Sequence, residues 1–243
     1  MPRTREIFGG LIILTGATLM FAGERLWAWA SNQPTGDDAL IIAVVLGETD
    51  TARRAISAGA SIDGQSMFGY TPLILAAGVG DERLVRFLLA HGAAVDATGP
   101  HGWTALGYAA CGTADVPTMR VLLHAGACPD GARPDGRSGT TMEFSRPLVS
   151  GITSGHYAAA ELLLTWGADP NLYQMCGSRT SPLTAAAFAG GDNQRIVGLL
   201  IAAGADVNRP DGQGVTPLRA ATEAGDAALA KILRQAGADA RLN

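Results

Sequence analysis

The stretch GYTPLILAAGVGDERLVRFLLAHGAAVD, residues 69–96, contains start and stop signals for two short helices. Thr71 is a good N-terminal cap, and Pro72 suits the first helical position, where its missing N–H costs nothing. Asp81 is a cap for a second helix, whose apolar residues fall on one stripe at helical spacing. Gly92 suits the left-handed residue that ends such a helix. The stretch therefore predicts a helix pair whose apolar face must be buried against another part of the chain.

The same pattern recurs along the chain, and its closing Gly-Ala pair gives a register. The glycines of this pair are Gly59, Gly92, Gly126, Gly167, Gly204 and Gly237, with spacings of 33, 34, 41, 37 and 33 residues. Self-similarity at such a period is typical of repeat proteins, in which each unit buries its apolar face against its neighbours. The sequence therefore predicts stacked helix pairs, with the largest insertion as a loop over residues 130–146.

The repeated motifs resemble those of the ankyrin-repeat family. Thr71-Pro72-Leu73 and Thr216-Pro217-Leu218 match the family's Thr-Pro-Leu-His signature except at the final His. Gly204-Ala205-Asp206-Val207-Asn208 is similar to its closing motif, and Gly155-His156 to its inter-helix Gly-His, where the imidazole usually bonds to local backbone. The chain departs from the pattern at Ala105, where Pro is expected, and at Arg146, where Thr is expected.

This resemblance implies an all-α solenoid of about six helix-turn-helix repeats joined by short β-turn loops. The expected ankyrin-repeat domain covers residues 37–243, with repeats at about 37–68, 69–101, 102–139, 145–178, 180–213 and 214–243. We expect the domain to be monomeric.

The amino-terminal segment, residues 1–30, differs in kind from the repeats. Arg3 and Arg5 precede an uncharged stretch of 17 residues, 7–23, which is the layout of an export signal. Ala28-Trp29-Ala30 offers a cleavage site, although the stretch is long for a signal core and short of the ~20 residues of a membrane span. The segment is therefore interpreted as a cleaved signal peptide or an uncleaved anchor, and a buried helix that caps the first repeat is the third alternative.

Either of the first two interpretations places the repeats outside the cytoplasm. The Arg pair would stay on the cytoplasmic side, so the domain would be periplasmic or anchored in a bacterial inner membrane through residues 7–23. Residues 31–36, with the sequence SNQPTG, form a short polar linker before the repeats.

The composition argues against a nucleic-acid partner. The 243 residues carry a formal net charge of −4, and no basic stripe is present to bind phosphates. Hydrophobic residues make up 47% of the chain but aromatic residues only 6%. This mix favours small, closely spaced helices over a core of large side chains.

No motif for catalysis, a cofactor or a metal ion is found. None of the four histidines belongs to a His-Glu-x-x-His pattern, the cysteines lack the paired spacing of a zinc site, and no glycine motif joins a strand to a helix. His91 and His124 are expected in the last turns of helices, where a cation suits the helix dipole. Asp81, Asp192 and Asp226 each follow a Gly and are expected to be N-caps.

The three cysteines allow at most one disulfide bond. Cys111 falls near the end of a first helix, whereas Cys128 and Cys176 lie in the connections of neighbouring repeats. If the domain is exported, Cys128 and Cys176 are therefore the candidate pair, provided that their Cα atoms lie within ~7 Å. The alternative is that all three are ordinary small residues.

The residues just before and within each Thr-Pro-Leu start are the candidate binding residues. In an ankyrin-like stack, the inter-repeat loops and the first helices form a concave groove where partners usually dock. In repeats two and three these positions hold Met67, Phe68, Tyr70, His101, Trp103 and Tyr108, whereas in repeats five and six they are small or polar. Aromatic side chains dominate binding hot spots. The alternative is that Trp103 and Tyr108 fold inward and cover neighbouring loops.

These features indicate a non-enzymatic scaffold that binds another protein in the groove, outside the cytoplasm. One alternative is an immunity or protective accessory protein dedicated to one enzyme or toxin. Another is an enzyme with a small site in the groove, which would need titratable groups that converge on one spot.

Overall fold

The computed structural model describes residues 36–113, 115–131, 146–173, 179–189, 193–239 and 241. The expected signal or anchor, nearly all of the expected linker, and most of the long loop at 130–146 lie outside these residues. Asp192 and Cys176 also lie outside them. Across the described ranges, no helix has the length and apolar character needed to cross a membrane.

The helix pair predicted around Thr71 is confirmed. Helix α5 (Pro72–Val79) begins after Thr71, whose Oγ1 accepts the N–H of the residue three places on at 3.3 Å. Helix α6 (Glu82–Ala90) begins after Asp81, whose carboxylate accepts the equivalent N–H at 2.9 Å. Gly80 ends α5 with a φ of 74°, a left-handed conformation that glycine adopts without steric cost. The local signals therefore fix both the limits of the helices and the turn between them.

Five further helix pairs have the same arrangement. They are α3 (Asp37–Val45) with α4 (Thr49–Ser57), α7 (Ala105–Cys111) with α8 (Val116–His124), α9 (Pro147–Thr153) with α10 (Tyr157–Thr165), α11 (Pro182–Ala189) with α12 (Gln194–Ala202), and α13 (Pro217–Glu223) with α14 (Ala227–Gln235). A short 3₁₀ helix, η1 (Pro100–Gly102), precedes α7. The described residues thus form an all-α solenoid of six helix pairs, as predicted.

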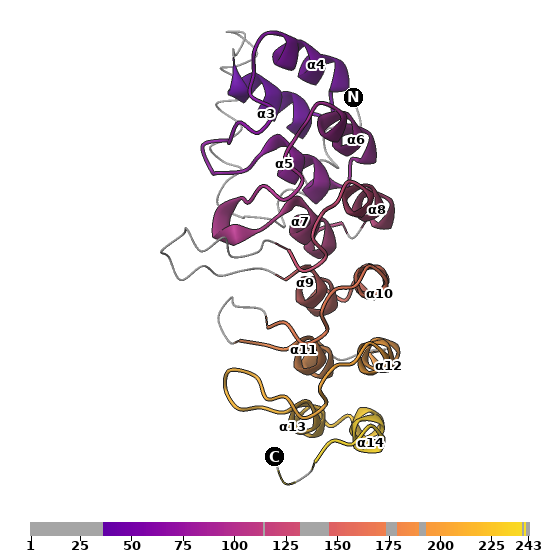
Figure 1. Ribbon diagram of the computed structural model, residues 1–243. Coiled ribbons are helices and arrows are strands. Elements are labelled where there is room, and N and C mark those ends of the chain that lie inside the picture. The colour runs from indigo at the N-terminus through magenta and orange to yellow at the C-terminus, as the bar shows by residue number, and fades with distance from the viewer. Residues whose placement is uncertain are drawn as a thin grey trace.

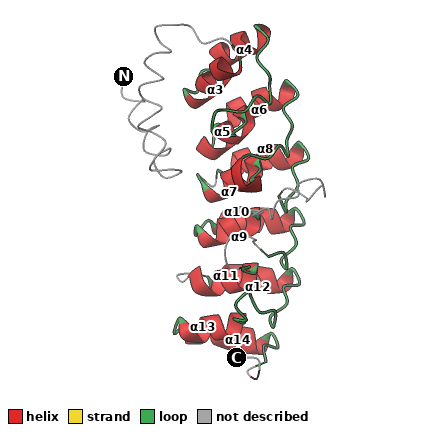
Figure 2. Ribbon diagram, turned by 90° about the vertical axis from the view of Figure 1, so that its left-hand side faces the viewer, coloured by secondary structure: helices red, strands yellow, loops and turns green. Residues whose placement is uncertain are grey.

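The pairs stack into two columns (Figure 1), one of first helices and one of second helices. Each first helix from α3 to α13 packs on the next first helix, and the second helices from α6 to α14 do the same. Figure 2 shows the pairs as successive layers. We call the side from which the connections before the first helices project the loop side (Figure 1).

Small residues in the first helices and leucines in the second helices form the core. Ala76, Ala77, Ala109 and Ala110 are fully buried, and their small volume allows neighbouring first helices to approach closely. Leu88 and its equivalents in the later second helices are also buried, namely Leu122, Leu163, Leu200 and Leu233. Each such side chain contributes ~1.5–3 kcal/mol by leaving water. The stability of the stack is therefore a sum over neighbouring pairs.

The two departures from the family pattern have different structural results. Thr104 still caps α7 although Ala105 replaces Pro, because its Oγ1 accepts the N–H of the residue three places on at 3.3 Å. Arg146 makes no side-chain cap for α9. Its guanidinium instead donates to the carbonyl of Asp130 at 2.8 Å, so it ties the two ends of the long loop together.

One side chain per repeat bonds to the backbone of the next repeat. Four residues after each landmark glycine, the carboxylates of Asp63, Asp96 and Asp130 each accept one N–H from the following repeat, at 3.0, 3.0 and 2.8 Å. Asn171 and Asn208 accept the same bond at 2.8 and 2.7 Å. Their amides also donate to the carbonyls of the next landmark glycines, at 2.9 and 3.2 Å. The last two junctions therefore have one more hydrogen bond each than the earlier ones.

Candidate protein-docking surface

Three equivalent turns lie on the loop side, directly before the first helices of repeats two, three and six. In each, the N–H of the first residue donates to the carbonyl of the fifth: Ser66 to Tyr70 at 2.8 Å, Gly99 to Trp103 at 2.8 Å, and Asp211 to Val215 at 2.9 Å. A second backbone bond, from the fourth residue to the first carbonyl, closes each turn. The three turns thus share two closing bonds, and the turn of repeat three adds the bond of η1, from the N–H of Trp103 to the carbonyl of Pro100 at 3.3 Å.

The turn of repeat two exposes two large apolar side chains at its tip. Met67 is 68% exposed and Phe68 is 41% exposed. The tip of the turn in repeat six instead carries Gly212, Gln213 and Gly214. Apolar exposure at this place therefore follows from the sequence of one repeat and is no requirement of the fold. Exposed apolar clusters of this kind typically mark interaction sites.

An aromatic cluster lies behind this tip. Tyr70 and Trp103 are half-buried against the core, and their rings contact that of Tyr108, with centroid distances of 5.6 and 5.0 Å. Tyr108 itself is only 7% exposed. It therefore folds inward, and it supports Tyr70 and Trp103 from beneath. We call Met67, Phe68, Tyr70 and Trp103 the aromatic tip.

Burial raises the pKa of Tyr108, and a hydrogen bond with the Tyr70 side chain raises it further. Both effects favour the neutral phenol, because a buried phenolate would lose its hydration and the hydrogen bond with Tyr70 favours the protonated form. Tyr108 is thus a neutral structural group at physiological pH.

The side chains of two predicted site residues, His101 and Cys176, are not described. The backbone of His101 lies in η1, but its side chain falls outside the described atoms. Cys128 is half-buried, and its backbone N–H donates to Asp96 across the junction. Because Cys176 lies outside the described residues, its pairing with Cys128 stays a prediction.

The described histidine side chains have structural contacts. His91 and His124 each place Nδ1 2.7 Å from the carbonyl four residues earlier in the same helix. His156 was expected to bond to local backbone, and this is wrong. Its Nδ1 lies 3.1 Å from the carbonyl of Ala110 in the preceding repeat. His156 directly precedes α10, in the turn after α9, and α9 packs on α7, which brings the imidazole to this carbonyl.

Two of the three acidic residues predicted as N-caps are described, and both are caps. Asp81 and Asp226 each accept an N–H from the first turn of their helix at 2.9 Å, as predicted. Within the ranges that the structure describes, no three His, Cys, Asp or Glu side chains are grouped so that they could hold a metal ion.

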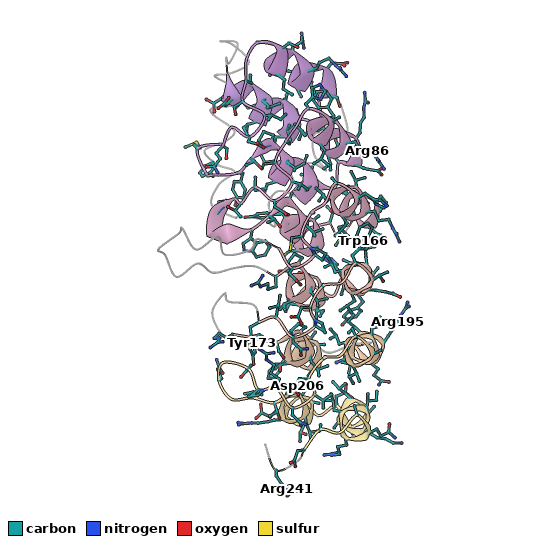
Figure 3. The ribbon with its side chains drawn as sticks, in the orientation of Figure 1. Arg86, Trp166, Tyr173, Arg195, Asp206 and Arg241 are labelled. Atoms are coloured by element: carbon teal, nitrogen blue, oxygen red, sulfur yellow. The ribbon has the colours of Figure 1, made fainter. Side chains whose placement is uncertain are left out.

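A basic cluster on the loop side was missed by the sequence analysis. The guanidinium carbons of Arg209 and Arg179 lie 4.3 and 5.2 Å from the centroid of the Tyr173 ring. Figure 3 shows Tyr173 on the loop side, opposite Arg195 on the side of the second helices. The sequence could have indicated part of this cluster. Tyr173 and Arg209 lie in the connections after α10 and α12, and these connections are neighbours because the two helices stack.

Comparison with known proteins supports the fold and the family. A family model described as ankyrin repeats (3 copies) matches residues 40–135 and 148–243. The chain is similar to a solved ankyrin repeat domain from Acinetobacter baumannii AYE, with a TM-score of 0.69, 27% identity, and coverage of 82% of this chain and 98% of that one.

A curated relative is much longer than this chain. Over 107 residues, which are 44% of the chain, it is 32% identical to the mouse (Mus musculus) protein named inactive serine/threonine-protein kinase TEX14. The match spans only 7% of that protein's length. The two family matches together cover most of the six helix pairs seen in the structure. This chain therefore belongs to the ankyrin-repeat family.

Proposed function

We propose that this chain is a non-enzymatic scaffold that docks another protein on its loop side, at the aromatic tip, and that it does so outside the cytoplasm. Ankyrin repeats generally mediate protein–protein interaction, and the family is generally non-catalytic. The observation that carries the proposal is the exposure of Met67 and Phe68 on a turn whose equivalent in repeat six is polar.

The geometry of the turn suits docking. Two backbone hydrogen bonds close the turn, and the N–H of Tyr70 also donates to the Ser66 hydroxyl at 3.1 Å. The tip is therefore held in one conformation before a partner arrives, which lowers the entropy cost of binding. The methionine side chain can adapt to an irregular partner surface, and each buried square ångström of apolar area contributes about 25 cal/mol.

The proposed location rests on the amino-terminal sequence. Arg3 and Arg5 precede the uncharged stretch 7–23, and this order of charges favours transfer of the following domain across a membrane. The aromatic tip would then face the periplasm, on a domain that is either anchored or released.

Partner capture tests the docking role. The full-length chain and its Met67→Ser/Phe68→Ser variant would be cross-linked in cells and recovered, with quantification of co-purified proteins by mass spectrometry. We expect one or more proteins to be lost from the variant. Phe188→Ser is a matched control, because Phe188 is 50% exposed on α11 and lies outside the aromatic tip. An unchanged set of partners would overturn the proposal, whereas one stoichiometric partner would narrow it to a dedicated accessory protein.

Fractionation with intact-mass measurement tests the location. A mature chain that starts at Ser31 in the periplasmic fraction, or the full-length chain in the membrane fraction, would support export. Full-length chain in the cytosolic fraction would overturn this part of the proposal.

A further inference from the structure

Two arginine side chains converge on one tyrosine ring in repeats four and five. Tyr173 and Arg179 lie in the connection between α10 and α11, and Arg209 follows α12, so two neighbouring connections supply the cluster. Arg179 is exposed, whereas Tyr173 and Arg209 are half-buried. Both guanidinium groups lie within cation–π range of the same ring, which holds two like charges close together.

The positions of Tyr173 and Arg179 are fixed by contacts with residues 210–212. The hydroxyl of Tyr173 donates to the carbonyl of Pro210 at 2.7 Å, and the N–H of Gly212 donates to the carbonyl of Arg179 at 2.8 Å. A Cβ atom on Gly212 would fall 2.8 Å from the Cβ of Arg179, so a larger residue there would displace Arg179. The cluster is therefore preorganised.

The two arginines have no acidic partner within the described part of the chain. The ion pairs in that part involve other arginines: Arg86, Arg195, Arg219 and Arg241. The nearest acids in sequence, Asp206 and Asp211, direct their carboxylates to backbone N–H groups of their own turns, at 2.8–2.9 Å. A cation–π contact leaves the N–H edges of a guanidinium as donors, so the pair retains its charge and its capacity for bidentate hydrogen bonds.

We propose that Arg179 and Arg209, on the platform of Tyr173, bind a short carboxylate-rich segment of the partner protein. This inference rests on the proposed function, because it adds a second contact to the same partner on the same side of the stack. A carboxylate between the two guanidinium groups would relieve their repulsion and accept hydrogen bonds from both. A nucleic acid fits less well, because its backbone needs a stripe of basic residues along successive phosphates, and the sequence contains no such stripe.

Fluorescence anisotropy with synthetic peptides tests this inference. The probe is a fluorescein-labelled peptide with four glutamates between glycines, and the reference is the same peptide with four glutamines. We expect the full-length chain to bind the glutamate peptide at least about tenfold more tightly. The variant Arg179→Gln/Arg209→Gln should bind the glutamate peptide about tenfold more weakly. The variant Arg179→Lys/Arg209→Lys should retain part of the affinity, because lysine keeps the positive charge but lacks the planar guanidinium group.

A control variant separates a local site from overall charge. Arg195→Gln/Arg241→Gln removes the same formal charge from side chains that are 71% and 93% exposed and lie elsewhere on the stack (Figure 3). We expect its affinity for the glutamate peptide to stay within about twofold of the parent. Equal losses in both double variants, or equal binding of the two peptides, would overturn the inference.

Two further probes define the ligand class. Tighter binding of a phosphoserine peptide of matched charge, or of a single-stranded oligonucleotide, would overturn the assignment to carboxylates. The Met67→Ser/Phe68→Ser variant should bind the glutamate peptide like the parent. Failure of the aromatic tip to capture a partner would therefore leave the peptide result intact, and failure of peptide binding would leave the docking role intact.

Discussion

Asn171 accepts the backbone N–H of Asp206 at 2.8 Å, across the junction between the fourth and fifth repeats. Its amide also donates to the carbonyl of Gly204 at 2.9 Å, so one side chain makes two bonds to the next repeat. At the first junction, Asp63 makes only the accepting bond, to the N–H of Ala94 at 3.0 Å. A carboxylate has no donor for the carbonyl of the landmark glycine.

Asp63→Asn should therefore stabilise the domain, because the new amide can donate to the Gly92 carbonyl. We expect a gain of about 0.5–1 kcal/mol in the free energy of unfolding, measured by urea denaturation. The reciprocal change, Asn171→Asp, should lower the stability by a similar amount. A loss of stability in both variants would contradict this prediction, because it would show that the hydrogen bond from the amide to the glycine carbonyl does not raise the stability of a junction.

Gly80→Ala should destabilise the domain more than Gly225→Ala. Both glycines follow a first helix with a left-handed φ, of 74° and 72°, so both changes introduce the same backbone strain of about 1 kcal/mol. Only at Gly80 would the new Cβ meet another group, the Thr113 Oγ1 at 2.7 Å. We expect an additional cost of about 1 kcal/mol there. Thermal unfolding of the two variants side by side checks this, and equal losses would contradict it.

Gly198→Ala should stabilise the domain by about 0.5–1 kcal/mol. Gly198 lies inside α12 on its exposed face, and a Cβ there would meet nothing within 4 Å. Alanine reduces the backbone freedom of the unfolded chain without a steric cost in the folded one. Urea denaturation should show a higher midpoint with an unchanged slope, and a lower midpoint would indicate a contact that the structure does not contain.

The domain should lose stability in alkali through Tyr108. Burial and the hydrogen bond with Tyr70 raise the pKa of Tyr108 in the folded state. The unfolded state therefore loses the phenolic proton at a lower pH than the folded state does. The corresponding stabilisation is present below the ordinary tyrosine pKa of about 10 and is lost as the pH rises above it. Urea denaturation between pH 8 and 11 should show this fall, and Tyr108→Phe should reduce its slope. Identical slopes would contradict the assignment.

Trp103→Ala should weaken partner capture, whereas Tyr108→Phe should leave it unchanged. Trp103 is half-buried and belongs to the aromatic tip, but Tyr108 is 7% exposed and offers almost no surface to a partner. The measurement is the same quantitative recovery of cross-linked partners. Loss of capture in Tyr108→Phe, with the fold retained by circular dichroism, would instead assign Tyr108 a direct contact.

Most of the fold follows from the sequence because each repeat is delimited by local signals. Thr71 and Pro72 fix the start of a helix, Gly80 its end, and the recurrence of Gly92 every 33 to 41 residues fixes the stacking order. Each of these signals acts within a few residues and needs no knowledge of distant contacts. The contact predicted for His156 was wrong because its imidazole lies against a carbonyl of another repeat, that of Ala110.

The candidate surface was predictable only in part. Met67 and Phe68 could be placed at a tip because the turn that carries them is local. The inward position of Tyr108 and the meeting of Arg179 with Arg209 depend on how different connections lie against one another in space. Side chains from separate repeats have no fixed spacing in sequence, since the insertions between repeats change their separation.

The turns before α5 and α13 share their closing bonds, which makes them interchangeable parts. These bonds lie within each turn, and the tip of the second one is small and polar. Transplanting Phe68 onto the position of Gln213 would thus move an apolar anchor four repeats along the stack. Gly212 sets the limit of such grafting, because the neighbouring Arg179 leaves no room for a side chain.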